Sequence, residues 1–130
     1  IAGVDLCLGD AAFSPAELDQ MSATPLGRFI AEGNRVKLGF NENLTGTPFV
    51  DLPDAVAMAA ALYPEVVTES ITAHCYCCTK ETPAYGQVII YDISKPFSVK
   101  YDIPETYSTV IKTIDPALFK KLLMKSFSDL

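Results

Sequence analysis

The sequence has 130 residues, of which 49% are hydrophobic, and it carries a formal net charge of −6. This length suits one domain with its own core and is too short for two ordinary domains, so residues 1–130 are expected to form a single domain. The acidic charge argues against nucleic acid as a partner, because a phosphate-binding surface needs clustered Lys and Arg. The longest apolar run, residues 55–63, is far below the roughly 20 residues needed to cross a bilayer, which predicts a soluble chain without a membrane span.

The first third of the sequence predicts a strand followed by two helices. Alternating apolar residues over 1–8 indicate a short strand. The pattern Ser-Pro-Ala-Glu from Ser14 predicts a helix that begins with a capping box. This helix is expected to end near Thr24, because the residue before a proline is pushed out of the helical region. A second short helix is expected to run through Ala31 and to be closed by Gly33 in a left-handed conformation.

The middle of the sequence predicts a strand and an apolar helix. Val36, Leu38 and Phe40 alternate with polar or small residues, which indicates a half-buried strand. Asp51 is expected to cap a helix over residues 52–63. That helix is apolar nearly all round, so we expect it to be buried on several sides or to contact another subunit.

The second half predicts an antiparallel meander and a C-terminal helix. Four strands are expected, bounded by turn residues: 66–78, 84–93, 97–103 and 106–114. Residues 88–91 are apolar on both faces, which favours a central strand. An amphipathic helix is expected to begin at Asp115. The predicted fold class is therefore α+β, a mainly antiparallel sheet packed with three to four helices.

The one concentration of reactive groups is His-Cys-Tyr-Cys-Cys from His74 to Cys78, which holds three of the four cysteines and the only histidine. A zinc site usually takes ligands from two short clusters, and only Cys7 lies elsewhere. Side chains alternate along a strand, so the cluster is divided between two faces of the sheet. We therefore predict no metal and no cofactor. A metal site, if present, would draw on the following residues: Cys7, His74, Cys75, Cys77 and Cys78.

The alternation also predicts which side chains face the core. Cys75 and Cys77 share a face with apolar residues and are expected to be small core residues, whereas His74 and Tyr76 point the other way. A disulfide between Cys7 and one of the three clustered cysteines is the alternative.

Other catalytic patterns are weak. With one histidine, a Ser-His-Asp triad would need His74, and no Gly-x-Ser-x-Gly turn or glycine-rich phosphate loop accompanies it. Asp51 and Asp54 lie at a helix start, where the helix dipole favours negative charge without a catalytic role. Six tyrosines could line a ligand groove on the sheet, although aromatic residues favour strands in any case.

Three functions remain open from the sequence. The leading hypothesis is a non-catalytic assembly subunit that packs against copies of itself or against other subunits. It depends on the positive mean hydropathy (+0.22), on the apolar helix and on the missing catalytic pattern. The alternatives are a thiol or metal protein that uses the 74–78 cluster, and a small-ligand binding module on a tyrosine-rich sheet face.

Overall fold

The computed structural model describes residues 1–92 and 107–127, and it confirms an α+β fold with an antiparallel sheet and a C-terminal helix. Among the described residues there are four α-helices: α1 (Pro15–Met21), α2 (Pro25–Thr45), α3 (Pro53–Leu62) and α4 (Pro116–Ser126). The described part of the chain also holds three strands: β1 (Val67–Cys77), β2 (Val88–Asp92) and β3 (Tyr107–Ile114). Three short 3-10 helices complete the order: η1 (Val4–Cys7), η2 (Gly9–Ala11) and η3 (Pro64–Val66).

The described sheet has the order β2-β1-β3, and both pairs are antiparallel. The long strand β1 is central: Ile71 pairs with Val110 of β3, and Cys75 pairs with Ile90 of β2. Residues 88–91 were expected in a central strand, but in the described sheet they pair with β1 alone. The strand predicted over 97–103 lies outside the described residues.

The strand predicted over residues 1–8 is wrong, because residues 4–7 of this segment form η1, and η2 follows it directly after Leu8. Leu6 and Cys7 are adjacent and both buried, which a strand that alternates between two faces does not allow. The first residue is nevertheless hydrogen-bonded to the sheet, because the amide of Ile111 in β3 donates to the Ile1 carbonyl (2.9 Å).

The prediction of a helix closed at Gly33 and a strand around Val36 is also wrong. Instead, α2 runs for 21 residues, starts with the Thr24 side chain accepting from the Gly27 amide (3.1 Å), and ends at Gly46 in a left-handed conformation (φ 79°). The alternation of three apolar residues suits a helix as well as a strand when the helix has apolar residues on two sides. Leu38 packs against the core, whereas Val36 is exposed on the opposite side.

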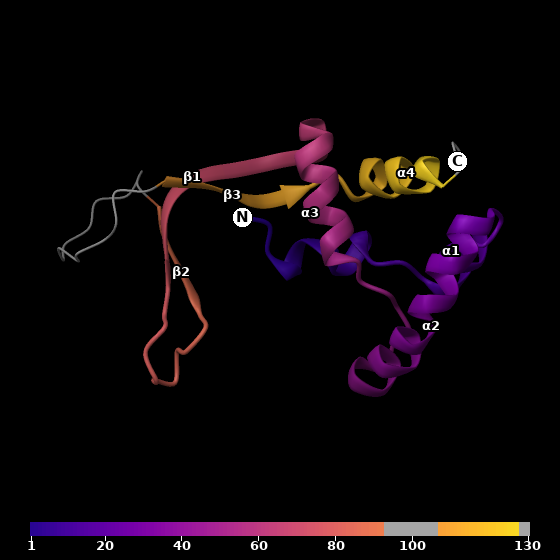
Figure 1. Cartoon of the computed structure of the whole chain (residues 1–130), viewed down its shortest axis with the longest axis horizontal. Helices are drawn as coiled ribbons and strands as arrows, with labels where there is room; N and C mark the ends of the chain where they lie inside the picture. Colours follow the sequence, from indigo (N-terminus) through magenta and orange to yellow (C-terminus); the bar gives the residue numbers. More distant parts are fainter. Residues whose placement is uncertain (93–106, 128–130) are drawn as a thin grey trace.

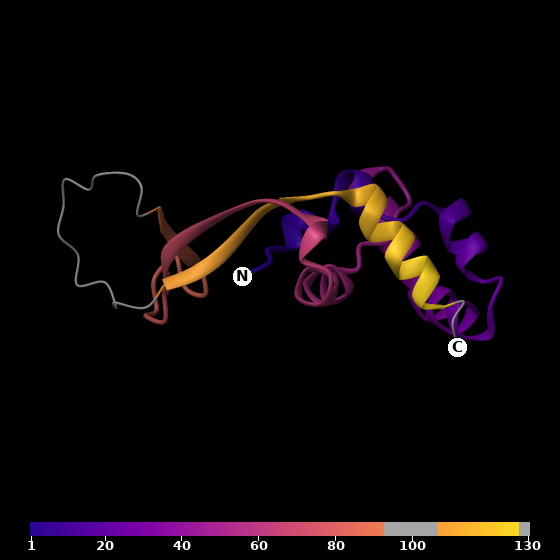
Figure 2. The same cartoon turned by 90° about the horizontal axis from the view of Figure 1, so that it is seen from above.

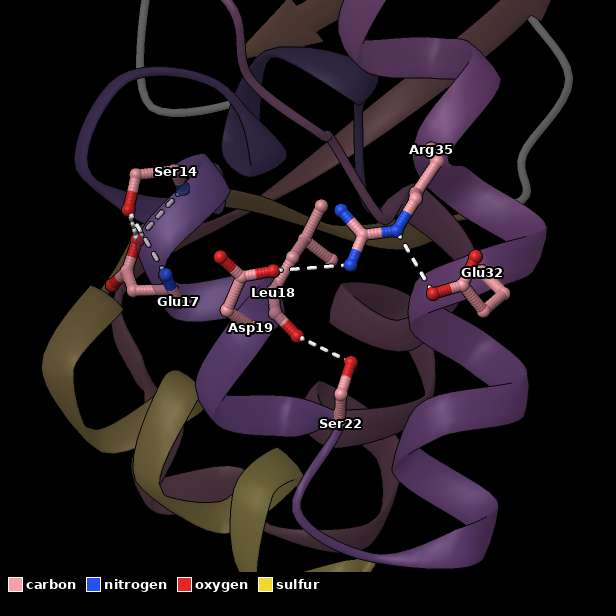
Figure 3. A network of polar contacts seen from close by, with 7 residues as sticks. All are labelled: Ser14, Glu17, Leu18, Asp19, Ser22, Glu32 and Arg35. Carbon is pink, nitrogen blue, oxygen red and sulfur yellow. Dashed lines mark hydrogen bonds and ion pairs between the residues drawn. The ribbon is translucent and has the colours of Figure 1, made fainter.

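The start of α1 is confirmed as a capping box formed by Ser14 and Glu17. Arg35 of α2 reaches back to α1 and donates to Asp19 (3.0 Å), while it also bonds Glu32 one turn away on its own helix (2.9 Å) (Figure 3). These ion pairs are largely exposed, so they orient the two helices and add little stability.

The helices gather at one end of the β1–β3 pair, and the β1–β2 hairpin extends from the other end (Figures 1 and 2). The buried core lies at the helical end, where Phe13 meets the Phe119 ring edge-on at 6.1 Å. Lys120 of α4 bonds Glu17 of α1 (2.8 Å) and lies over the Phe13 ring. No helix among residues 1–92 and 107–127 is long and apolar enough to cross a membrane.

Candidate functional site

Asp51 lies in a short connection that is fixed on both sides. The preceding residue, Val50, pairs with Phe13 through two backbone hydrogen bonds of 2.8 Å. Pro53, two residues after Asp51, begins α3, and proline is well suited to a first helical position. Asp51 was expected to cap this helix, but Leu52 holds the cap position and no side chain caps it. The Asp51 carboxylate is therefore turned toward α2.

Two residues of α2 hold that carboxylate. Lys37 and Asn41 are four residues apart and so share one face of the helix. The Lys37 ammonium donates to the Asp51 carboxylate (3.1 Å) and to its backbone carbonyl (2.7 Å). The Asn41 side-chain amide donates to the other carboxylate oxygen (3.2 Å) and to the Phe49 carbonyl (2.9 Å). Asn41 is the one buried polar side chain among the described residues.

These contacts keep Asp51 ionised. Its side chain is only 15% exposed, and burial, the largest single influence, raises its pKa. The hydrogen bonds from Lys37 and Asn41, a backbone hydrogen bond and the positive charge of Lys37 together outweigh burial, so the pKa of Asp51 lies below its ordinary value. The nearby Cys7 thiol responds in the opposite direction: burial, followed by the negative charge of Asp51, raises its pKa.

A pocket of about 370 Å³ opens beside this cluster. Its polar lining comes from α2 and from the start of α3: Asn34, Lys37, Asp51 and Asp54. Its apolar lining comes from the same two places and from the C-terminal end of α4: Ile30, Leu52, Pro53, Ala55, Leu123 and Phe127. Two carboxylates, an ammonium and an apolar wall in one pocket of this size suit a small polar ligand with a ring.

The cluster from His74 to Cys78 lies elsewhere, at the end of β1 that pairs with β2. The ring of His74 stacks on Tyr107 of β3 with centroids 4.3 Å apart. Cys7 lies in η1, fully buried, and its thiol donates to the Val4 carbonyl (2.8 Å). Within residues 1–92 and 107–127, no three His, Cys, Asp or Glu side chains come together in a way that could hold a metal ion.

The predicted burial of the two core cysteines is wrong for Cys77, which is exposed, while Cys75 is half-buried. In the part of β1 nearer the helices, the predicted core-facing side of the strand is correct, because Ala73 is buried and Thr72 is exposed. Beyond Ala73 the strand leaves the helices and nothing among the described elements covers that face. All four cysteines are free thiols, so the alternative of a disulfide is not realised.

The described tyrosines lie in several places rather than in one groove. Tyr91 and Tyr107 flank His74 across the sheet, and Tyr76 follows along β1. Tyr63 lines a groove between α3 and α4, and Tyr85 lies in the turn before β2.

The sequence contained two signals for the site around Asp51. The acidic residues Asp51 and Asp54 were noted, but their position at a helix start explained them fully. The spacing of Lys37 and Asn41 carries information only if residues 35–41 are helical, and that segment was predicted to be a strand.

Two solved structures of nucleoside hydrolases share this fold. A plant nucleoside hydrolase, PpNRh1, superposes with a TM-score of 0.81 over 93% of this chain at 14% sequence identity. An inosine-guanosine nucleoside hydrolase superposes with a TM-score of 0.66 over 95% of this chain at 18% identity. The chain spans 38% and 37% of the lengths of these two proteins. No protein-family model and no curated protein matches the sequence.

These likenesses correct the leading functional hypothesis. A non-catalytic structural or assembly subunit was expected, but the two similar solved structures named above are enzymes. The absence of a familiar catalytic motif in the sequence was therefore a poor reason to favour a purely structural role.

Proposed function

We propose that this chain forms the ligand-binding part of a nucleoside hydrolase, a protein that cleaves the bond between a ribose and its base. The observation that carries this proposal is the pocket beside Asp51, which joins two carboxylates and an ammonium to an apolar wall within a fold found in nucleoside hydrolases. A nucleoside needs both kinds of lining, because its sugar is rich in hydroxyl groups and its base is a flat ring.

The lowered pKa of Asp51 decides which role it can take. A general base works best with a pKa near the working pH, and the pKa of Asp51 is shifted away from that range. An anionic carboxylate can instead accept hydrogen bonds from ribose hydroxyls. It can also stabilise the positive charge that develops on the sugar ring as a glycosidic bond breaks. The two hydrogen bonds of Lys37 use two of its three N–H groups, so the third can bind a ligand oxygen.

Binding provides the direct test, because the chain is much shorter than the enzymes it resembles. Inosine and ribose would be titrated into the ¹⁵N-labelled protein, and the side-chain amide signals of Asn34 and Asn41 would be followed by NMR. We expect both signals to shift at millimolar inosine, and Asp51→Asn to weaken binding by at least tenfold. Glu65→Gln, an exposed acidic residue away from the pocket, is the matched control and should bind as the wild type does.

Unchanged amide signals in millimolar inosine, or equal binding by the wild type and Asp51→Asn, would contradict the proposal. A shift caused by ribose alone, with no further effect of the base, would restrict it to the sugar half of the ligand.

We further propose that the chain works in contact with other protein, either a copy of itself or another subunit. Large apolar side chains are exposed on several elements, among them Phe29 of α2, Met58 of α3 and Val88 of β2. Sedimentation of the purified chain over a range of concentrations tests this proposal, and a single species with the mass of one chain would contradict it.

A further inference from the structure

Three residues on one face of α2 line the pocket beside Asp51: Ile30, Asn34 and Lys37. At 100° per residue, these three positions fall within about 60° of one another around the helix. Along the helix axis, Asn34 lies about 6 Å after Ile30 and about 4.5 Å before Lys37. The Asn34 amide is therefore placed between an apolar part and a charged part of the pocket lining.

The half-buried Asn34 side chain is held in one orientation. Its amide nitrogen donates to the Ile30 carbonyl (2.9 Å), and because a carbonyl oxygen can only accept, this contact identifies which end of the amide is nitrogen. An asparagine amide has two N–H groups and an oxygen with two lone pairs. Within residues 1–92 and 107–127 no other group bonds this amide, so one N–H and the carbonyl oxygen can contact a ligand.

The helix itself does not need this side-chain amide. Inside an α-helix the Ile30 carbonyl already accepts the backbone N–H of Asn34, so the side-chain hydrogen bond is a second one to the same oxygen. Asparagine is also a poorer helix former than leucine, because its short polar side chain competes for backbone hydrogen bonds. Ligand binding accounts for a polar group at this position, whereas helix stability does not.

We propose that Asn34 recognises the base of a nucleoside bound in this pocket. Its carbonyl oxygen accepts from a ring N–H, and its free N–H donates to the acceptor beside that group, such as the C6 carbonyl beside N1–H in hypoxanthine, the base of inosine. The ribose then lies toward Lys37 and Asp51, and the ring contacts the apolar wall that includes Ile30. This inference rests on the proposed nucleoside function and adds to it the residue that binds the base.

Removing the polar groups from the ligand and from the protein in turn tests this contact. Purine riboside has the ring system of inosine without N1–H and the C6 carbonyl. In NMR titrations we expect the wild type to bind inosine at least tenfold more tightly than purine riboside, which is roughly the effect of two hydrogen bonds. Asn34→Leu should bind both nucleosides with equal affinity and ribose as the wild type does. Asn43→Leu, at an exposed position of α2 outside the pocket lining, is the matched control and should keep the preference for inosine.

A gain of binding in Asn34→Asp separates base recognition from folding. This substitution replaces the amide nitrogen by a second oxygen, and a carboxylate can accept from two neighbouring N–H groups at once. Guanine presents two such groups, at N1 and N2, whereas hypoxanthine presents only the one at N1. We therefore expect Asn34→Asp to bind guanosine at least tenfold more tightly than inosine, while the wild type should bind these two nucleosides with similar affinity.

An Asn34→Leu protein that still prefers inosine would overturn the inference, and so would an Asn34→Asp protein without a preference for guanosine. Loss of ribose binding in Asn34→Leu would also overturn it, because Asn34 would then support the pocket as a whole. If the wild type binds inosine and purine riboside equally, the role of Asn34 is overturned and the nucleoside proposal stands. A wild type that binds neither nucleoside would overturn both.

Discussion

The state of the Asp51 carboxylate depends on residues that lie 10 to 14 positions earlier in the chain. Lys37 supplies charge and Asn41 supplies a neutral donor, so the two oxygens of the carboxylate have different partners. An ionised group that is largely buried is tolerated only with such partners. The pair of donors and the backbone bridge at Val50 thus place a fixed negative charge at the edge of the pocket.

Asp51→Asn is expected to lower the free energy of unfolding by about 1–2 kcal/mol at pH 7, which is the scale of a partly buried charge-assisted hydrogen bond. The folded-state pKa of Asp51 is lowered, so its contribution to stability is full above the unfolded value of roughly 4 and disappears as the pH falls through the folded value. The difference between the wild type and the variant should therefore be seen in urea unfolding at pH 7 and should vanish at the acid end. A difference that grows on acidification would contradict this assignment, and Glu65→Gln should show almost none at pH 7.

At the scale of elements, α2 is where sequence and structure diverge most. Gly33 was expected to close a short helix and the Val-x-Leu-x-Phe pattern after it favoured a strand, yet the helix continues to Thr45. A helix with apolar residues on two opposite sides loses the one-sided periodicity from which helices are recognised. By contrast, α1 and α4 were predicted well, because Ser14 and Asp115 cap them as expected and each has one apolar side.

A pair of identical substitutions distinguishes the interior of α2 from its end. Gly39→Ala should raise the free energy of unfolding by about 0.5–1 kcal/mol, because Gly39 is helical and exposed with open space around its Cα. Gly46→Ala should lower it by about 1 kcal/mol, because Gly46 holds the left-handed conformation that closes the helix. Urea unfolding and far-ultraviolet circular dichroism measure both. Equal effects of the two substitutions would mean that α2 does not extend past Gly39.

The sheet and the site differ in how far the sequence predicts them. Strands β1 and β3 were predicted within one residue, because turns and prolines bound them clearly. The site was not predicted, since it is built from contacts between α2 and the start of α3 that no local pattern encodes. Cys75 and Cys77 show the same limit: alternation assigns a face, but only the arrangement of the helices decides how far along β1 that face is covered.

At the scale of the whole molecule, the chain has a packed end and an extended end (Figure 1). The largest fully buried side chains, such as Phe13, Val50 and Phe119, all belong to the core at the helical end. In the β1–β2 hairpin beyond Ala73, every described side chain is at least partly exposed. Two strands alone are marginally stable in water, so we expect the hairpin to open more readily than the rest of the chain.

The four thiols report on these two ends, because Cys7 lies in the core and the other three lie on or beside the hairpin. In a pulse of N-ethylmaleimide followed by mass spectrometry, Cys77 should be modified first and Cys75 and Cys78 more slowly. Cys7 should be modified only under denaturing conditions, since it is fully buried and its raised pKa keeps it protonated at neutral pH. Cys7→Ala should cost about 1 kcal/mol or more of stability, whereas Cys77→Ala should have almost no effect. Rapid modification of Cys7 in the native protein would mean that η1 is not part of a closed core, and protection of Cys77 would mean that another protein surface covers the hairpin.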